Sequence, residues 1–458
     1  MNMDVNDSLL DLIGNTPMMK LKSLDTGPCD LYVKLELNNP GGSIKDRVGL
    51  SIIEEAEKSG ELKPGGTIIE ATAGNTGIGL ALIAALKGYK IILVIPDKMS
   101  REKILHLEGL GAEIILTRSD VPEGHPEYYQ DMARKLAQET PGAFLANQFG
   151  NPANPTAHRT TTAPEIWEQM QGNIDAVVAG VGSGGTLTGL AEFFKSKDPS
   201  ICMVAADPEG SIISDAVLKG EYNYDGGSWL VEGVGEDFIP DTFEVSLMDD
   251  AETVSDKEAF EVLQIILKEE GILGGSSTGT LVAAAAKWCR KQKEHKNVVT
   301  FICDTGNKYL SKAFNKAWLQ DNNLLDLKTY GDLRDLINRR ADQGEMISVN
   351  ETDSLLVAYN RMRASDVSQI PVMKGDKLVG ILDEEDLLFA VSKDQSSFSN
   401  NVSDYMMDHL DTLKFDASKD ELLSILTEGK VAIIFDGETF IGFVTKVDLI
   451  NYYRNKFK

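Results

Sequence analysis

The sequence predicts an α/β protein in which a mostly parallel, doubly wound domain precedes a smaller α/β module with an internal repeat. Two patterns lead to this prediction. Up to about residue 320, short β-branched runs alternate with longer helical patterns, which is the order of right-handed βαβ units. Beyond residue 342 this order gives way to two copies of one shorter unit. We therefore expect a first domain over 1–320, a linker over 321–342 and a second module over 343–458.

Several of the expected strands are almost continuously apolar, as strands buried on both faces of a parallel sheet should be. These strands are Leu31–Leu37, Thr67–Glu70, Lys90–Ile95, Ala112–Leu116, Ala176–Gly180, Cys202–Ala206 and Asn297–Ile302. Ligands of doubly wound sheets bind beyond the carboxyl ends of the strands. The glycine-rich and polar segments that follow these strands are therefore where we expect the chemistry.

The second module contains two copies of a repeat with a period of roughly 60 residues. Two copies are too few for a solenoid. The first copy includes 349–356 and 378–388, and the second includes 414–423 and 440–450. We expect a pseudo-symmetric pair that packs on itself, preceded by a polar helical linker over Tyr330–Arg340. In the second copy, Thr445 ends a strand and Asp448 follows one helical turn later, so the two could grip both hydroxyls of a ribose.

Composition and charge exclude several classes of function. The net charge of −26 over 458 residues argues against binding to nucleic acids or anionic membranes, which need clustered Lys and Arg. The four cysteines form no CxxC pair, and none of the five histidines has metal-ligand spacing. No signal peptide or membrane span is recognisable. We expect a cytoplasmic protein without a metal site.

The stretch Asn38–Arg47 joins a strand to a helix through a Pro/Gly-rich turn and presents Lys45 near the helix start. A cation is unfavourable there, because the helix dipole favours anions at that end. Lys45 could be an ordinary surface lysine. It could equally be a nucleophilic amine whose pKa is lowered by positive potential, as Schiff-base chemistry requires.

Two further loops offer backbone N–H groups at a helix start. Residues 71–79, Ala-Thr-Ala-Gly-Asn-Thr-Gly-Ile-Gly, could cradle a carboxylate or phosphate, or could form a plain capped turn. Residues 180–186, Gly-Val-Gly-Ser-Gly-Gly-Thr, predict an anion-binding loop that is not a Walker loop. They also satisfy G-x-G-x-x-G, and Asp207 ends the next strand. An NAD-dependent enzyme is therefore an open alternative.

Three other polar segments follow strands or open helices. Residues 303–307, Cys-Asp-Thr-Gly-Asn, bring a carboxylate, a hydroxyl and an amide to one strand end, or cap the next helix. Residues 147–151 follow a strand in the same manner. The turn 271–279 opens an alanine-rich helix, and could pack on a ligand or merely permit close helix packing.

These motifs resemble those of the fold-type II pyridoxal-phosphate (PLP) enzymes of the cysteine synthase and cystathionine β-synthase family. The resemblance rests on residues 12–17, Leu-Ile-Gly-Asn-Thr-Pro, and on 41–47, Gly-Gly-Ser-Ile-Lys-Asp-Arg. Residues 208–211 and 232–240 are more similar to the cystathionine β-synthases, and the repeat resembles a tandem CBS-domain (Bateman) module. The resemblance covers nearly the whole chain. It implies two doubly wound subdomains and condensation of L-serine with L-homocysteine to cystathionine and water.

The resemblance also implies a role for each site residue. Lys45 would carry PLP as a Schiff base, take the Cα proton of serine and help the β-hydroxyl leave. Asn75 would bond the 3′-oxygen, and Thr305 would face the ring nitrogen, where Asp304 would give the opposite electronics. The PLP phosphate would lie on Gly182, Ser183, Gly184, Gly185 and Thr186. The substrate carboxylate would lie on Thr72, Ala73, Gly74, Thr76 and Gln148.

The chain departs from the family pattern at several places. Ala73 stands where many relatives carry serine, and Glu236 stands where relatives of the animal enzyme carry tyrosine. Glu236 could meet the amino group of homocysteine or change which thiol is accepted. The haem-binding N-terminal extension of the animal enzyme has no counterpart here, so we expect no haem. O-acetylserine in place of serine, and sulfide in place of homocysteine, stay open.

For the second module, Thr445 and Asp448 match ribose-contacting positions of the family's S-adenosylmethionine site. The resemblance thus implies an S-adenosylmethionine or other adenosine effector, although a purely structural or dimerising module is the alternative. It also implies a homodimer or higher homo-oligomer, and closure of the catalytic domain over its substrate.

Overall fold

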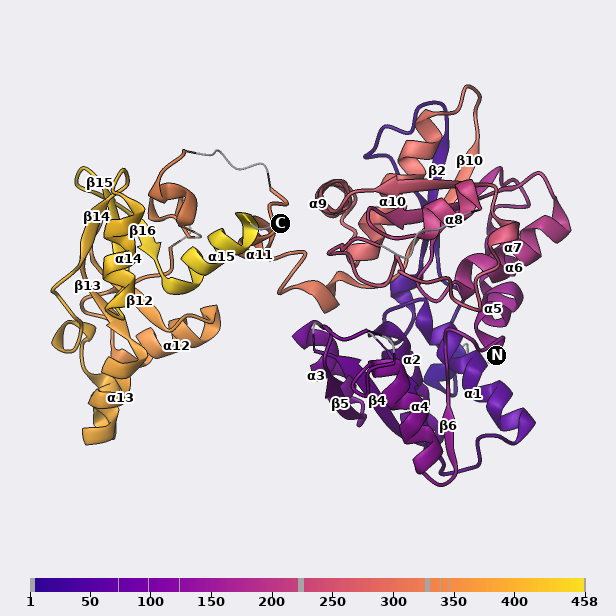
Figure 1. Ribbon diagram of the computed structural model, residues 1–458, viewed down its shortest axis with the longest axis horizontal. Helices are drawn as coiled ribbons and strands as arrows, with labels where there is room; N and C mark the ends of the chain where they lie inside the picture. The colour runs from indigo at the N-terminus through magenta and orange to yellow at the C-terminus, as the bar shows by residue number, and fades with distance from the viewer. Residues whose placement is uncertain are drawn as a thin grey trace. The chain divides into compact units, whose positions relative to one another are not determined.

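The computed structural model describes residues 5–72, 74–97, 99–122, 124–220, 226–325, 330–337, 339–344 and 346–456. The chain forms two compact units, Met1–Trp318 and Leu319–Lys458, which are drawn in indigo to orange and in orange to yellow in Figure 1. The predicted α/β fold class is confirmed, with two mixed or parallel sheets in the first unit and two small sheets in the second.

The larger sheet of the first unit has six strands in the order β1-β2-β10-β7-β8-β9. Its strands are β1 (Met18–Lys20), β2 (Asp30–Leu35), β7 (Ala176–Gly180), β8 (Cys202–Pro208), β9 (Asp250–Val254) and β10 (Asn297–Ile302). Only β1 runs antiparallel to its neighbour. Strands β7 and β10 are almost wholly buried, in agreement with their apolar sequences.

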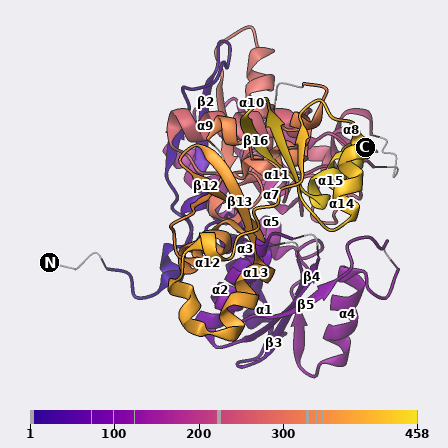
Figure 2. The same cartoon turned by 90° about the vertical axis from the view of Figure 1, so that its left-hand side faces the viewer.

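The smaller sheet of the first unit is fully parallel, in the order β5-β4-β3-β6. Its strands are β3 (Thr67–Ala71), β4 (Lys90–Pro96), β5 (Glu113–Thr117) and β6 (Ala143–Leu145). Figures 1 and 2 show this sheet and the larger one as separate halves of the unit. The chain leaves the larger sheet after β2, builds the smaller one, and returns with β7. The loop after β2 therefore runs from one half to the other.

Helices cover the sheets of the first unit. They are α1 (Lys45–Ser59), α2 (Asn75–Lys87), α3 (Arg101–Gly109), α4 (Tyr129–Glu139), α5 (Ala153–Ala157), α6 (Ala163–Gln169), α7 (Gly185–Lys197), α8 (Ile213–Lys219), α9 (Asp256–Glu270), α10 (Ser276–Arg290) and α11 (Lys316–Asp321), which runs past the boundary of the unit. Helices α1 and α2 approach so closely that a Cβ atom on Gly79 would lie 2.6 Å from the carbonyl oxygen of Lys45. This packing brings the start of α2 beside Lys45.

The second unit contains the predicted repeat, because each half follows the order β-α-β-β-α. The first half comprises β11 (Val349–Asn350), α12 (Leu355–Ser365), β12 (Gln369–Lys374), β13 (Lys377–Asp383) and α13 (Glu384–Lys393). The second comprises β14 (Thr412–Lys414), α14 (Lys419–Thr427), β15 (Ala432–Asp436), β16 (Thr439–Val444) and α15 (Lys446–Lys456). Each half has its own apolar core.

The prediction of a polar helical linker over Tyr330–Arg340 is wrong for the residues described there. Only a short 3₁₀ turn, Leu333–Leu336, forms. Leu333, Leu336 and Ile337 are buried in the core of the second half of the repeat. These three apolar side chains recur at helical spacing, but they serve to cover α14 and β15 and not to separate two domains.

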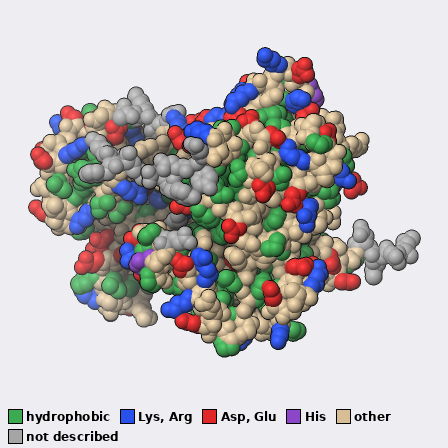
Figure 3. Space-filling view, turned by 45° about the vertical axis from the view of Figure 1, so that its right-hand side comes forward, with side chains coloured by type: hydrophobic (Ala, Val, Ile, Leu, Met, Phe, Trp, Pro, Cys, Tyr) green, Lys and Arg blue, Asp and Glu red, His purple; other side chains and the backbone are tan. Residues whose placement is uncertain are grey.

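Charged side chains of both signs are mixed on the one face that Figure 3 draws. The face drawn in Figure 3 carries Lys and Arg side chains interspersed with Asp and Glu, without a continuous basic patch among the coloured atoms. Within the described ranges, no helix is long and apolar enough to cross a membrane. No group of three His, Cys, Asp or Glu side chains in those ranges could hold a metal ion.

Candidate active site

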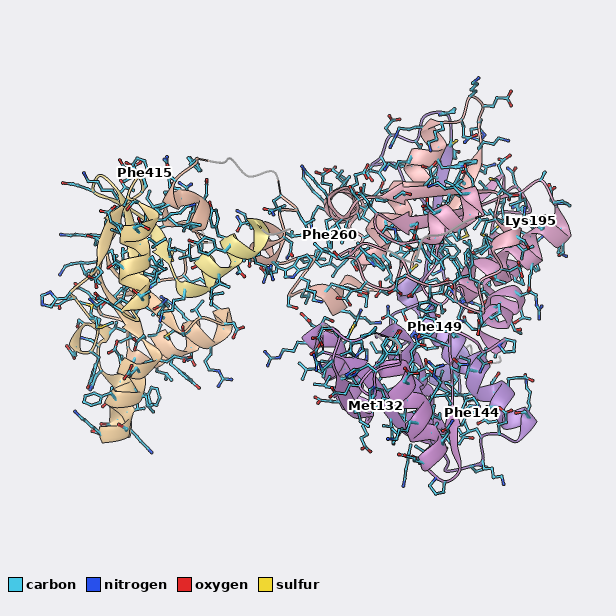
Figure 4. All side chains as sticks on the ribbon, viewed as in Figure 1. Met132, Phe144, Phe149, Lys195, Phe260 and Phe415 are labelled. Atoms are coloured by element: carbon cyan, nitrogen blue, oxygen red, sulfur yellow. The ribbon has the colours of Figure 1, made fainter. Side chains whose placement is uncertain are left out.

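A cavity in the first unit collects most of the residues predicted to form the site. It is lined by Lys45, by Thr72, Gly74, Asn75 and Thr76, by Gln148, by Gly182, Ser183, Gly184 and Thr186, and by Glu236. Further lining residues are Ile44, Lys103, Phe149, Ala179, Gly180, Gly233, Val234, Ser277, Leu281, Phe301 and Cys303. Figure 4 labels Phe149, which lies where the two halves of the unit meet. The cavity thus draws residues from both sheets.

The loop that precedes Lys45 is held by the residues that follow β10. Lys45 is the first residue of α1, and the preceding loop pairs with the end of β10. The N–H of Ile44 donates to the carbonyl of Cys303 at 2.9 Å, and that of Thr305 donates to the carbonyl of Gly42 at 3.0 Å. Strands β2 and β10 are parallel neighbours, so the polar segments at their carboxyl ends meet, as expected for this sheet class.

Burial lowers the pKa of the Lys45 ammonium, while Cys303, Asp304 and Glu236 oppose that shift. Desolvation disfavours the charged form of an amine. The second interpretation of Lys45 expected positive potential to lower this pKa. Here desolvation lowers it instead, because the neighbouring groups act to raise it.

The glycine loop after β7 leaves room only for glycine at its critical positions. Gly184 caps α7 with φ of +84°, and a Cβ atom there would lie 2.4 Å from Phe243. A Cβ atom on Gly185 would lie 2.2 Å from Oδ1 of Asn154, and one on Gly182 would lie 2.7 Å from the carbonyl oxygen of Gly233. The loop lines the cavity at the start of the 13-residue helix α7, and the N-terminus of a helix favours a bound anion.

Two buried side chains position the hydroxyls of this loop. Asn154 donates from Nδ2 to Oγ of Ser183 at 2.9 Å. Thr186 Oγ1 lies 3.1 Å from Nε2 of His158, whose Nδ1 lies 2.9 Å from Thr162 Oγ1. Burial holds the pKa of His158 well below its usual value. The sequence indicated only that this histidine is no metal ligand; its contact with Thr186 emerges from the fold.

The loop before α2 and the segment after β6 meet across the smaller sheet. Thr76 donates from Oγ1 to Oε1 of Gln148 at 2.5 Å, and Thr72 accepts from the N–H of Gly74 at 3.2 Å. Strands β3 and β6 are parallel neighbours, which explains why these distant segments come together. Ala73 lies outside the described residues.

Glu236 lines the cavity from the opposite side. Its backbone is fixed by Ser211, whose Oγ accepts from the N–H of Glu236 and donates to its carbonyl, both at 3.0 Å. The neighbouring Gly235 has φ of +88° and its N–H donates to the carbonyl of Val181. This contact ties the Glu236 segment to the glycine loop after β7.

The prediction that Thr305 faces the cavity has no support in this geometry. Thr305 is not among the described residues that line the cavity, and its Oγ1 accepts from the N–H of Asn307 at the start of a short 3₁₀ helix. Ser277, near the start of α10, lines the cavity instead. The glycine-rich turn 271–279 was the sequence signal for it. That turn pairs with 304–305, since the N–H of Gly275 donates to the carbonyl of Asp304.

Polar contacts bridge the two halves of the unit at Lys103 of α3. Its Nζ lies 2.6 Å from Oε2 of Glu232, whose Oε1 lies 2.7 Å from Nζ of Lys312. In addition, Glu102 accepts from the N–H and the hydroxyl of Ser311. Phe149 packs edge-on against Phe238, with the ring centroids 5.5 Å apart. These contacts hold α3 over the residues that follow β10.

Thr445 and Asp448 are close together but engage each other. Thr445 donates from both N and Oγ1 to Oδ2 of Asp448, at 2.7 and 2.6 Å. The same reciprocal cap occurs at Asp383 and Asp386 in the first half of the repeat. Thr445 and Asp448 thus lie side by side, as predicted, but their polar groups bond each other and cap α15.

Glu70 is a buried acid behind the Gln148 contact that sequence reasoning missed. It lies in β3 and is 1% exposed. Its Oε1 accepts from the N–H of Gln148 at 3.4 Å, and its Oε2 has no hydrogen-bond partner among the described residues. Burial raises the pKa of Glu70 to about 8, so the folded protein favours the neutral acid at neutral pH.

Glu70→Gln is expected to make the protein more stable at alkaline pH. The folded-state pKa exceeds the unfolded value of 4.5, so wild type loses stability as pH rises from about 4.5 to about 8 and levels off above that. The variant's advantage in the free energy of unfolding should grow over this pH range, to on the order of a few kcal/mol at its plateau. Melting temperatures of both proteins, measured at several pH values, should diverge accordingly. Glu61→Gln, at an exposed acid, is the control and should show no such trend. A pH-independent difference for Glu70→Gln would contradict the assignment.

The residues of the cavity fit PLP. An amine with a lowered pKa can bond the aldehyde carbon, and the glycine loop at the start of α7 lines the same cavity as that amine. The remaining wall supplies the Asn75 amide and the hydroxyls of Thr72 and Ser277. These groups are of the kinds that bind the ring substituents of PLP and an amino-acid carboxylate.

Comparison with known proteins agrees with this fit. The sequence matches the family of pyridoxal-phosphate dependent enzymes over residues 9–304, and the CBS domain over 333–393 and 402–455. It is 36% identical to the cystathionine beta-synthase of Dictyostelium discoideum, over 98% of this chain and 92% of that protein. It is 34% identical to the cystathionine beta-synthase of Saccharomyces cerevisiae, over 98% of both chains.

A solved structure extends the similarity. The O-acetylserine dependent cystathionine beta-synthase of Helicobacter pylori is 40% identical, covers 68% of this chain and 99% of that one, and superposes with a TM-score of 0.62. Fold, cavity and these matches define a PLP-dependent enzyme of fold type II. These matches favour a PLP-dependent enzyme over the NAD-dependent alternative. The chain belongs to the cystathionine β-synthase family.

Proposed function

We propose that the protein condenses L-serine with L-homocysteine to L-cystathionine and water. The observation that carries this proposal is the single cavity in which Lys45, the glycine loop after β7, the Thr72–Thr76 loop and Gln148 meet. Support comes also from the relatives named cystathionine beta-synthase, which match the chain along nearly its whole length. The structure of the Helicobacter pylori relative favours O-acetylserine as an alternative first substrate.

Lys45 performs the proton transfers in this proposal. PLP, when bound, withdraws electrons from Cα of the amino acid and thereby acidifies its proton. Lys45 would hold the cofactor covalently in the enzyme without substrate. Its neutral amine then takes the Cα proton and gives a proton to the departing β-hydroxyl, which leaves as water. The thiol of homocysteine adds to Cβ and gives its proton to Lys45, which returns a proton to Cα.

Other residues hold and orient the reactants. The loop Gly182–Thr186 binds the cofactor phosphate through N–H groups and the hydroxyls of Ser183 and Thr186. Asn75 donates to the 3′-oxygen of the cofactor. The carboxylate of the first substrate lies on the loop Thr72–Thr76, including Ala73, and on Gln148. Thr76 already donates to Oε1 of Gln148, and Nε2 of Gln148 donates to the carbonyl of Ala71 at 3.5 Å. The second hydrogen of Nε2 is therefore the one that can turn to the carboxylate.

We assign the position opposite the ring nitrogen to Ser277 in place of Thr305. Ser277 lines the cavity and lies at the start of a 15-residue helix, whereas the hydroxyl of Thr305 is used as a helix cap. A neutral hydroxyl does not protonate the ring, so elimination is favoured over a long-lived carbanion.

Exclusion of water falls to the contacts between α3 and the segment after β10. The Lys103–Glu232–Lys312 ion pairs and the Glu102–Ser311 hydrogen bonds hold the two halves together. A closed cavity protects the reactive species from hydrolysis. Opening and closure of these contacts is the proposed route for substrate entry.

Glu236 is the proposed partner of the homocysteine amino group. Glu236→Gln should raise KM for homocysteine about tenfold or more, because one charge-assisted hydrogen bond is lost. Sulfide has no amino group, so with sulfide as the thiol the variant should match wild type. Equal losses with both thiols, in steady-state assays of the same preparations, would contradict this role.

A steady-state comparison of four substrate pairs tests the function. Serine and O-acetylserine are each combined with homocysteine and with sulfide, and products are separated by chromatography. The proposal expects the highest kcat/KM for serine with homocysteine. Higher kcat/KM with O-acetylserine would assign the alternative, and absence of turnover with every pair would refute both.

For the second unit, we propose an S-adenosylmethionine or other adenosine effector at Thr445 and Asp448. The support is their adjacency at the end of β16 and their partial exposure. A ribose bound there must replace the hydrogen bond between Thr445 and Asp448 that caps α15. Binding would therefore affect the start of this helix. A thermal-shift titration with S-adenosylmethionine, adenosine and ATP should raise the melting temperature with at least one of them. Thr445→Val should abolish that shift; absence of any shift in wild type would leave the module structural.

We also propose a cytoplasmic homodimer or higher homo-oligomer. All four cysteines are free thiols, as suits a reducing compartment. Helices of the second unit expose apolar side chains, namely Leu388, Phe389, Val447 and Ile450, which an oligomer could cover. Light scattering of the eluting protein measures the mass directly.

A further inference from the structure

Asn75 is held between a cation and an anion. Nζ of Lys308 donates to Oδ1 of Asn75 at 2.8 Å, and Nδ2 of Asn75 donates to Oδ2 of Asp304 at 2.7 Å. An ammonium group only donates, whereas an ionised carboxylate only accepts. The two contacts therefore determine which way the amide of Asn75 faces. With its oxygen engaged by Lys308, the amide can offer the cavity only an N–H hydrogen.

Lys308 is buried and uses its other hydrogens on the loop that carries Lys45. Its Nζ donates to the carbonyl oxygens of Gly41 and Gly42, at 2.9 and 3.3 Å. The residue is 4% exposed. Lys308 therefore connects the Lys45 loop, at the end of β2, to the first residue of α2. Nothing in its sequence position, within the 3₁₀ turn after β10, indicated this role.

The cation is kept where water cannot replace it. Burial lowers the pKa of Lys308 to about 8, while Asp304 and Asp46 favour its charged form. The other ionisable groups that act on it are on α3: Lys103, which disfavours the charge, and His106, whose own pKa is lowered by burial and by Lys308. A buried ammonium at this place raises the positive potential beside Asn75.

We propose that Lys308 is a positioning residue for the 3′-oxygen of the cofactor. It orients Asn75 so that an amide hydrogen points to that oxygen, and its charge, one side chain away, stabilises the oxygen in its deprotonated form. This inference rests on the proposed function, since it assumes PLP on Lys45. Beside the 3′-oxygen the sequence indicated only the amide of Asn75, and this inference adds the charge of Lys308 behind it.

The test uses the holoenzyme and two readouts other than turnover. The first is the ratio of the visible absorption band, from the deprotonated 3′-oxygen, to the near-ultraviolet band, from the protonated one. The second is the dissociation constant for PLP, measured by adding PLP back to protein stripped of it. Lys308→Gln, which can still donate to Asn75 but carries no charge, should shift the band ratio toward the near-ultraviolet. Lys308→Met should in addition weaken PLP binding at least about tenfold.

Lys308→Arg should restore both readouts toward wild type, and Lys63→Met, at an exposed lysine of the same unit, should change neither. If Lys308→Met does not fold, the band ratio of Lys308→Gln still decides. Wild-type spectra in Lys308→Gln would overturn the inference and leave the proposed function standing. A wild type that binds no PLP would instead refute the proposed function.

Discussion

Lys45→Ala is expected to lower kcat for β-replacement at least about a thousandfold while leaving the fold intact. Lys45 is the only lysine proposed to exchange protons with Cα and the leaving group, and general acid–base catalysis by one side chain is worth about 10²–10⁴ in rate. The side chain of Lys45 is not part of the apolar core, to which α1 contributes Val48, Ile52 and Ile53. The melting temperature should therefore change little, whereas turnover should collapse.

Borohydride reduction gives this prediction a chemical readout. Treatment of wild type should fix PLP to the peptide that contains Lys45, as seen by mass spectrometry, and the variant should carry no such label. Lys58→Ala is the matched control, because Lys58 lies on the same helix and its side chain is 70% exposed. It should keep full activity and full labelling. Label on another lysine in wild type would refute the assignment of Lys45.

Arg47→Met is expected to destabilise the first unit by about 3–5 kcal/mol, the cost of leaving a buried carboxylate without its cation. Arg47 contacts Glu36 through Nε at 2.8 Å and Nη2 at 2.9 Å. It also contacts Glu165, at 2.6 and 2.7 Å. Glu36 is 0% exposed. Stability of a domain is often only 5–15 kcal/mol, so a large fall in melting temperature should follow.

The exposed pair Arg118–Asp120 supplies the matched control. Arg118 also bonds a carboxylate through two nitrogens, but the side chains of the pair are 52% and 69% exposed. Exposed ion pairs contribute about 0–1 kcal/mol, so Arg118→Met should barely change the melting temperature. Adding Glu36→Gln to Arg47→Met should recover part of the loss. Equal effects of Arg47→Met and Arg118→Met would contradict the buried-charge explanation.

The same network predicts how wild type responds to acid. Burial acts to raise the pKa of Glu165, but hydrogen bonds and charge from Arg47 and Lys34 prevail and lower it to about 2. A carboxylate with a depressed folded-state pKa contributes stability above its unfolded value of 4.5, and that contribution is lost as pH falls toward 2. In Arg47→Met this part of the acid sensitivity should be smaller.

Much of the fold could be predicted because parallel strands carry a strong local signal. The expected strands over 67–70, 90–95, 176–180 and 297–302 agree with β3, β4, β7 and β10 to within a residue or two at each end. Each is bounded by polar or glycine-rich residues and is buried on both faces, so its composition leaves few alternatives. The repeat was visible for the same reason, since both copies keep one order of apolar runs.

Which of Ser277 and Thr305 lines the cavity could not be predicted from position in the chain. Thr305 and Ser277 both follow glycine-rich or strand-end signals, and their two segments pair with each other. The two residues differ in what their side chains reach: Ser277 lines the cavity, whereas the hydroxyl of Thr305 caps a short helix. That difference arises only once the two segments are packed together. The linker failed for a related reason. Leu333 and Ile337 lie in a polar stretch, and only the packed core of the second half accounts for their burial.

The sequence by itself determined the class of the protein: an α/β domain with a lysine at a helix start, anion-binding loops at strand ends, and a tandem repeat. These features are local, since composition and spacing within some ten residues decide strands, turns and helix starts. Tertiary structure alone decided that Lys45 lines the cavity, that Ser277 and not Thr305 lines it too, and that Lys308 and Asp304 contact Asn75 from either side. Those contacts join residues more than 200 positions apart, and only the pairing of β2 with β10 and the close packing of α1 on α2 bring them together.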